Sequence, residues 1–253
     1  MTEQTKIRVG VLGASGRMGA QTCQAVDDAD GMDLAARVDR GDELSRLADA
    51  DVGVAVDFTR PDVVMDHIAW CVDHGVHAVV GTSGFDEERL ELVRDWLRGA
   101  PGTGVLIVPN FSIGAVLMTR FAGEAARFFE SVEIVELHHP GKADAPSGTA
   151  HRTAEIVAAA RADAGLPAMP DATTSESPGA RGAHIDGVRV HSVRLRGLLA
   201  HQEVLLGGPG ETLTIRHDST NRESFMPGVV AAIRAVGDRP GLTVGLDHVL
   251  GLA

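Results

Sequence analysis

The chain has few cysteines, no long apolar run and a deficit of positive charge. Cys23 and Cys71 are its two cysteines and show no paired spacing, so we interpret both as reduced packing residues of a cytoplasmic protein. No apolar run approaches the roughly 20 residues of a membrane span. No apolar signal-peptide segment precedes the first strand-like run. We therefore expect a cytoplasmic location and no membrane partner.

Basic residues are outnumbered, with 23 Lys and Arg against 35 Asp and Glu and a formal net charge of −12. A nucleic-acid-binding surface needs clustered lysine and arginine, so this balance argues against a nucleic-acid partner. What the chain does contain is the composition of an ordinary globular protein, with 44% hydrophobic and 23% charged residues. Its 253 residues suffice for one large domain or two smaller ones, each with its own core.

The first part of the chain alternates short apolar runs with helix-like segments. This alternation predicts parallel strands in an α/β, doubly wound, Rossmann-like sheet. Buried strands are expected near 7–12, 32–38, 51–58, 76–81 and 105–108. The intervening helices are expected to end near residue 27 and to span 61–74 and 86–99.

The pattern changes after residue 110. The following segments predict a second, α+β domain with a mixed or antiparallel sheet. They are helices near 113–129 and 147–165, strands near 132–138, 185–196, 201–206 and 212–217, and a Pro-, Ser-, Thr- and Gly-rich loop at 169–182. A last helix near 223–236 is expected to return to the first domain. We therefore place one domain at 1–110 plus 221–253 and the other at 111–220.

Three glycines follow the first predicted strand and precede the first helix. Gly13, Gly16 and Gly19 permit a tight turn and the close approach of backbone N–H groups to a pyrophosphate. The first interval is one residue longer than in the G-x-G-x-x-G pattern, and the spacing alone also fits a plain strand-to-helix turn. Asp39 ends the next strand, where an acid would bind ribose hydroxyls. Strand, helix and acid together favour a dinucleotide-binding domain at 1–110 plus 221–253.

Arg17 and Arg40 lie near the expected phosphates, although each by itself equally fits a solvated surface charge. Arg40 would pair with a 2′-phosphate, so we expect either NADH or NADPH as the cofactor. Two more loops, 81–84 and 108–111, follow predicted strands at the edge where open α/β sheets bind ligands. Each loop alone fits a connector, but with the glycine loop they would line one cleft.

The segment 138–149 is the second candidate site. His138, His139 and Lys142 supply positive charge and proton sources just before an expected helix start. Adjacent strand residues point to opposite faces, so the strand must end here if both histidines are to meet one ligand. Ser147, Gly148 and Thr149 offer helix N-terminal amides and hydroxyls to a carboxylate. The segment therefore predicts a site for a small dicarboxylate substrate.

Other interpretations of this segment stay open. The same residues fit a polar strand end, a turn and a capped helix. We expect no metal, because the cysteines lie elsewhere and no histidine spacing repeats. His151 and Asp144 lie nearby, but nothing marks them as metal ligands.

The run Glu136-Leu137-His138-His139, with Lys142 and Asp144-Ala145-Pro146-Ser147-Gly148-Thr149-Ala150, resembles the signature of the dihydrodipicolinate reductase family, also called 4-hydroxy-tetrahydrodipicolinate reductase. Loops 13–19, 81–84 and 109–111 match the family's pattern in order, and the similarity runs from residue 6 to about 250. The resemblance implies hydride transfer from NADH or NADPH to a cyclic imine derived from aspartate semialdehyde and pyruvate. The product would be tetrahydrodipicolinate, in diaminopimelate and lysine biosynthesis.

The resemblance also implies roles for individual residues. His138 would be the acid or base and Lys142 the proton donor, while His139, Gly148 and Thr149, together with Ser147, would hold a substrate carboxylate. The expected dinucleotide contacts, with Arg40 beside them, are Gly13, Ala14, Ser15, Gly16, Arg17, Met18, Asp39, Gly81, Thr82, Ser83, Val108, Pro109, Asn110 and Phe111. The family further implies a homotetramer built through the sheet of domain 111–220. Gly141 stands where some members carry another histidine, and Ser83 where threonine is common.

Two other functions remain open from the sequence. A dinucleotide-sensing protein without turnover would keep the glycines but would not need His138 and Lys142. An aspartate- or homoserine-type dehydrogenase would have a similar first domain, and a panel of substrates would separate it from the imine reductase.

Overall fold

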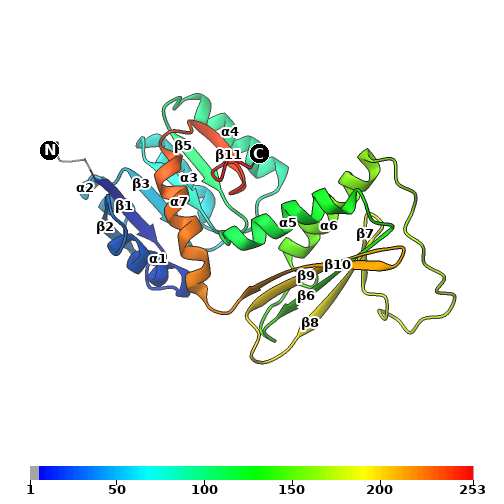
Figure 1. The fold of residues 1–253 in the computed structure, drawn as a ribbon. Helices are drawn as coiled ribbons and strands as arrows, with labels where there is room; N and C mark the ends of the chain where they lie inside the picture. The colour runs from blue at the N-terminus through cyan, green and yellow to red at the C-terminus, as the bar shows by residue number, and fades with distance from the viewer. Residues whose placement is uncertain (1–5, 253) are drawn as a thin grey trace. The chain divides into compact units, whose positions relative to one another are not determined.

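The computed structural model of the chain describes residues 6–252, which divide into two compact units (Figure 1). Within these residues, the first unit comprises 6–113 and 225–252, and the second is Gly114–Ser224. The junctions therefore lie three to four residues beyond those expected at 110 and 220. Phe111 accounts for the first shift, because it is 3% exposed and its carbonyl lies 2.0 Å from where a Cβ on Gly228 would stand.

A six-stranded sheet with the strand order β11-β5-β4-β3-β1-β2 forms the centre of the first unit. Every neighbouring pair is parallel, so the carboxyl ends of the strands lie along one edge. The strands are β1 (Ile7–Leu12), β2 (Met32–Val38), β3 (Val54–Asp57), β4 (His77–Val80), β5 (Gly104–Ile107) and β11 (Gly241–Val244). The chain leaves β1 for β2 on one side and returns to β3 on the other. The loops after β1 and β3 therefore meet at the point where ligands bind in such sheets.

Helices cover both faces of this sheet. They are α1 (Arg17–Asp27), α2 (Ser45–Asp49), α3 (Val64–Asp73), α4 (Glu87–Arg98) and α7 (Met226–Val236), the last preceded by a 3₁₀ turn, η1 (Arg222–Phe225). α1 packs against α7 and α3 packs against α4, on opposite faces (Figure 1). The predicted doubly wound fold is confirmed. The short helix α2 and the edge strand β11 were not predicted.

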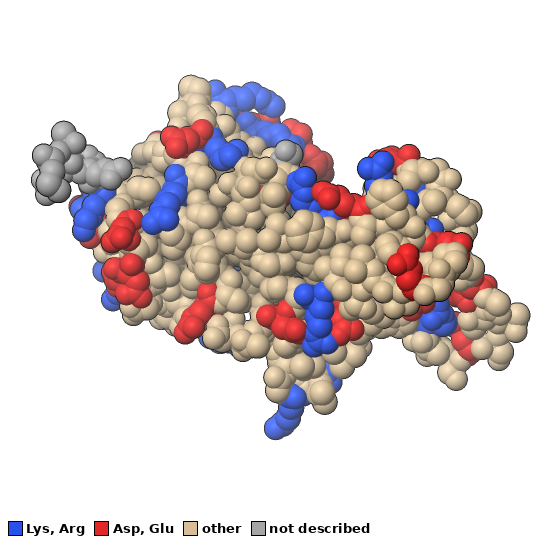
Figure 2. Space-filling view, viewed as in Figure 1, with Lys and Arg blue, Asp and Glu red and all other residues tan. Residues whose placement is uncertain are grey.

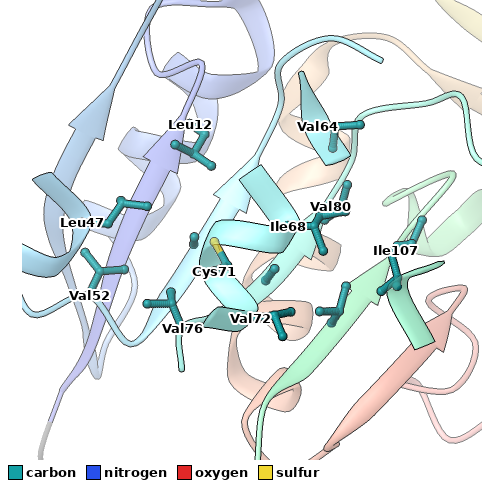
Figure 3. Close-up of a cluster of buried hydrophobic side chains, with 14 of the residues drawn as sticks. Leu12, Leu47, Val52, Val64, Ile68, Cys71, Val72, Val76, Val80 and Ile107 are labelled. Carbon is teal, nitrogen blue, oxygen red and sulfur yellow. The ribbon is translucent and has the colours of Figure 1, made fainter. Parts of the chain in front are cut away.

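One of the cores of the first unit consists mainly of branched aliphatic side chains from the strands, α2, α3 and α4, and Figure 3 shows part of it. Cys71 is 1% exposed and points its sulfur into this cluster. Burial raises the pKa of the Cys71 thiol to about 12, so the thiol stays protonated and packs as a small apolar group. Cys23 is also buried, and neither cysteine forms a disulfide.

The second unit contains a five-stranded mixed sheet with the order β10-β9-β6-β8-β7. β6 and β8 are parallel and the other neighbours are antiparallel, so the sheet is mixed, which is one of the two forms that the sequence predicted. Its elements are α5 (Ile113–Ala126), β6 (Ser131–His138), α6 (Gly148–Asp163), β7 (Ala183–Ile185), β8 (Val188–Arg194), β9 (Ala200–Gly208) and β10 (Glu211–Ser219). α5 and α6 contribute to a core with Val132, Ile134, Val190 and Val204 on the sheet.

The prediction of a single strand at 185–196 is wrong. Asp186 and Gly187 both have positive φ, of 47° and 90°, and form a two-residue turn that divides the segment into β7 and β8. Such Asp-Gly turns match the twist of antiparallel strands. Residues 166–182 connect α6 to β7, as the loop prediction required.

Charged residues of both signs are mixed on the face of the molecule that Figure 2 shows. In the described part of the chain, no helix is long and apolar enough to cross a membrane.

Candidate active site

The loop after β1 forms a close-packed cradle at the carboxyl edge of the first unit's sheet. Gly13 has a φ of +77°, and a Cβ on Gly19 would lie 2.0 Å from the Gly13 carbonyl oxygen, so neither position accepts a side chain. α1 begins at Arg17 with Gly16 as N-cap, and no side chain caps it. The first-turn amides of α1 therefore receive no side-chain oxygen from the N-cap, and the positive end of the helix dipole suits a phosphate.

Asp39 reaches this loop from the end of β2. Its carboxylate accepts hydrogen bonds from the Ser15 backbone N–H, with Oδ1 2.9 Å from the nitrogen, and from the Ser15 hydroxyl at 2.8 Å. The structure thus brings together the glycine loop and the acid that the sequence selected. Arg17 and Arg40 are exposed near these elements.

A buried carboxylate, Asp57, organises the loops after β3 and β4, and the sequence analysis gave it no role. Asp57 is 3% exposed. Its Oδ1 accepts from the Thr59 N–H at 2.9 Å, the Thr59 hydroxyl at 2.7 Å and the Thr82 hydroxyl at 2.6 Å. Its Oδ2 lies 2.7 Å from Nδ1 of His67 on α3. An acid as the last residue of a buried strand, at the carboxyl edge of the sheet, was the available clue.

Phe58 connects the three predicted dinucleotide loops. Its carbonyl oxygen would lie 2.7 Å from a Cβ on Gly13, and its ring would lie 2.2 Å from a Cβ on Gly81. The ring also packs edge-to-face on Phe111, with centroids 5.4 Å apart. Loops 13–19, 81–84 and 108–111 therefore converge, as the sequence predicted. Phe58 itself was missed, because its contacts are all to residues distant in the chain.

In the second unit, β6 ends at His138, and His139 begins the turn that follows. Nδ1 of His138 lies 2.5 Å from Oε2 of Glu136, whose side chain is completely buried. The Lys142 ammonium lies 2.7 Å from an oxygen of Asp144. Burial would raise the pKa of Asp144, but the hydrogen bond and charge of Lys142 bring it below its ordinary value.

Glu136 and Arg194 form the main ion pair beneath this segment. The Arg194 guanidinium donates to both Glu136 oxygens, each at 2.8 Å, and to the Asp144 carbonyl oxygen at 2.6 Å. Burial would raise the pKa of Glu136, but hydrogen bonds from His138, Arg194 and Ser192 outweigh it and lower the pKa to about 2. Glu136 belongs to the run quoted above, but neither it nor Arg194 was assigned a role.

α6 begins beside this ion pair. Ser147 is its N-cap, is 3% exposed and accepts from the Ala150 N–H at 3.2 Å, so its hydroxyl supports the helix start. Gly148 is exposed, and nothing lies within 4 Å of where its Cβ would stand. Thr149 is half-buried in the same first turn. A Cβ on residue 141 would stand 3.3 Å from Nδ1 of His139, so the glycine there leaves room for that ring.

Residues 6–252 contain no group of three or more His, Cys, Asp or Glu side chains placed to hold a metal ion. The second unit brings together cationic side chains, imidazoles and helix amides, and the glycine loop of the first unit is the candidate phosphate site.

Two family models match the chain almost end to end. The N-terminal model of dihydrodipicolinate reductase matches residues 7–111, and the C-terminal model matches residues 114–250. Proteins named 4-hydroxy-tetrahydrodipicolinate reductase are 63% identical over 246 residues in Nocardia farcinica and 59% identical over 248 in Streptomyces griseus. These alignments cover 97% and 98% of this chain and 99% of each relative.

A solved structure is also similar along its whole length. It is the dipicolinate-bound dihydrodipicolinate reductase from Paenisporosarcina sp. TG-14, at 39% identity and a TM-score of 0.82, with 96% of this chain and 99% of that one covered. Sequence and fold agree, and the chain belongs to the dihydrodipicolinate reductase family.

Proposed function

We propose that this chain reduces 4-hydroxy-tetrahydrodipicolinate to tetrahydrodipicolinate with NADH or NADPH, in diaminopimelate and lysine biosynthesis. Family membership supports the reaction. The observation that carries it is the end of β6, where two histidines and Lys142 precede the N-terminus of α6. The overall change adds one hydride and one proton to the substrate and releases one water.

The first unit holds the dinucleotide in this proposal. The glycine cradle and the uncapped start of α1 fit a pyrophosphate, and Asp39 fits a ribose diol. Loops 81–83 and 108–111 complete the site. When bound, the reduced nicotinamide supplies the hydride, and the protein supplies its orientation.

The second unit holds the substrate. The two carboxylates of the substrate account for a cationic segment in an acidic chain, because His139 and the amides of Gly148 and Thr149 offer charge and hydrogen-bond donors to one of these carboxylates. The relative from Paenisporosarcina binds dipicolinate, a planar dicarboxylate of similar size.

His138 and Lys142 manage protons. Lys142 carries protons on a flexible stem beside Asp144, and we assign it as the proton donor. His138 is the acid or base, because its ring is held at one nitrogen by Glu136.

The test is an absorbance assay of NAD(P)H oxidation with freshly prepared imine substrate. H138A and K142A should lose mainly turnover, by about 10²–10⁴-fold, while Thr149→Val should raise mainly the KM for substrate. Dinucleotide binding should survive in all three variants. Near-normal turnover in H138A and K142A would contradict the assignment. Activity on aspartate semialdehyde or homoserine in place of the imine would favour the other dehydrogenase class, and dinucleotide binding without any turnover would favour a sensor.

A homotetramer and a cytoplasmic location complete the proposal. α5 and α6 cover one face of the second unit's sheet, while the opposite face carries Leu205, which is 37% exposed. Pairing of sheets in a symmetric assembly would cover such a face. Light scattering at micromolar concentration should give four chain masses. Two free buried cysteines are consistent with a reducing compartment.

A further inference from the structure

We propose that Glu136, held by Arg194, is the positioning residue that fixes the orientation and tautomer of His138. The inference rests on the proposed role of His138 and extends it to a residue that does not itself face the ligand. The residue that controls the acid–base group His138 then lies inside the sheet, two positions before His138 in the chain.

The position of Glu136 in β6 is the first step. Val132, Ile134 and Glu136 alternate along the strand and point into the helix-covered face, and each is at most 1% exposed. A glutamate at this position is out of water, so its oxygens must be satisfied by the protein. The contacts of Glu136 therefore belong to the interior of the unit and are not those of a surface ion pair.

The donors around Glu136 define what it does. Oε2 lies 2.5 Å from Nδ1 of His138 and accepts from Arg194 at 2.8 Å. Oε1 accepts from Arg194 at 2.8 Å and from the Ser147 N–H at 3.2 Å. An ionised carboxylate has no proton to donate, so Nδ1 of His138 must carry the hydrogen. Nε2 is then the nitrogen through which His138 exchanges a proton with a ligand.

Arg194 makes this arrangement possible. A buried glutamate beside a neutral imidazole alone would be poorly compensated, and the bidentate guanidinium supplies the opposite charge. Arg194 comes from β8 and also binds the Asp144 carbonyl oxygen. One carboxylate and one guanidinium thus connect the end of β6, the loop that carries Lys142 and the start of α6.

The experiment is a double-mutant cycle on turnover. Glu136→Gln keeps the shape of the side chain but removes its charge. Carboxylates that orient a metal-bound histidine typically contribute about 10–100-fold to activity, and we expect E136Q to lose turnover by a similar factor with a smaller change in KM. In a His138→Ala background, Glu136→Gln should cause almost no further loss, because the residue acts through His138. Equal losses in both backgrounds would overturn the proposal and leave Glu136 a purely structural residue.

A matched control comes from the same strand. Glu133 lies on the opposite face of β6 and forms ion pairs with Arg181 and His191. Glu133→Gln should leave turnover unchanged while removing an equivalent charge from the same strand. A loss of turnover in E133Q as large as that in E136Q would also overturn the proposal.

A measurement on the unmodified chain keeps the proposal testable if E136Q does not fold. Nitrogen-15 NMR of the histidine rings, with His138 assigned by its absence in H138A, reports which nitrogen carries the proton. At a pH high enough for the ring to be neutral, the His138 signal should be that of the Nδ1–H form, and an Nε2–H form would overturn the proposal. Inactivity of the wild-type chain towards the imine would instead refute the proposed function, and the NMR result would still decide the role of Glu136.

Discussion

Replacing Asp57 with alanine should both destabilise the first unit and weaken its hold on the dinucleotide. Asp57 is the common acceptor for Thr59, Thr82 and His67, and these residues shape the loops after β3 and β4. Alanine removes every acceptor atom at once. The hydrogen-bond donors of these three residues then remain without the carboxylate, in a site where Asp57 was only 3% exposed.

The size of the loss follows from how many donors are stranded. The Thr59 N–H keeps an acceptor, because it also lies 2.9 Å from the Thr82 hydroxyl. The Thr59 hydroxyl and the Thr82 hydroxyl lose theirs, and Thr82 is 7% exposed. The His67 side chain is 19% exposed and is partly rehydrated. The buried Thr82 hydroxyl costs about 1–3 kcal/mol when it is stranded, and the half-buried Thr59 hydroxyl and the His67 ring, which water partly reaches, each cost less. The expected loss is about 3 kcal/mol in the free energy of unfolding.

Urea unfolding followed by tryptophan emission is the appropriate assay. Trp70 on α3 and Trp96 on α4 are the chain's two tryptophans, so the signal reports on the first unit alone. Asp57→Asn is the matched variant. Its amide oxygen replaces Oδ1, and its amide nitrogen can donate to His67 in the other tautomer, so it should lose only about 1 kcal/mol.

The dinucleotide affinity of each variant, measured by NADH fluorescence, should fall in the same order. Asp62→Ala, which removes an exposed carboxylate paired with Arg60, should leave both measurements unchanged. If Asp57→Ala unfolded at the wild-type urea concentration, the argument that this carboxylate organises the two loops would be refuted.

Three further predictions address the cofactor loop, cofactor choice and pH. Gly19→Ala should abolish most NADH binding, because its Cβ would lie 2.0 Å from a backbone oxygen, whereas Gly102→Ala, with open space around it, should not change the titration. Both NADH and NADPH should support activity, and Arg40→Ala should raise the KM for NADPH more than that for NADH; an unchanged KM for NADPH would contradict the role of Arg40. The folded-state pKa of Glu136, about 2, lies below its ordinary 4.5, so its stabilisation is present above pH 4.5 and disappears as the pH falls towards 2. The difference in unfolding free energy between wild type and E136Q should therefore shrink by about 3 kcal/mol across that window in urea titrations, and a constant difference would exclude this coupling.

The sequence alone predicted those elements whose residue pattern is local, that is, confined to consecutive residues. Short apolar runs that end in glycines or polar residues identified strands of the parallel sheet. This worked because a buried parallel strand is apolar along its whole length. The glycine loop and the segment from His138 to Thr149 were recognisable as candidate sites, because a phosphate or carboxylate site at a helix start uses consecutive residues. The resemblance to the reductase family, carried by those segments, is confirmed.

Only the tertiary structure decided which side chains support these sites. Glu136 meets Arg194, 58 residues away, because β6 and β8 pair with His138 opposite Arg194. Asp57 meets Thr82 because β3 and β4 end side by side. Strand pairing of this kind depends on how the whole sheet is ordered, which no local pattern contains. The sequence by itself marked the candidate binding loops, and the fold determined which buried carboxylates hold those loops in position.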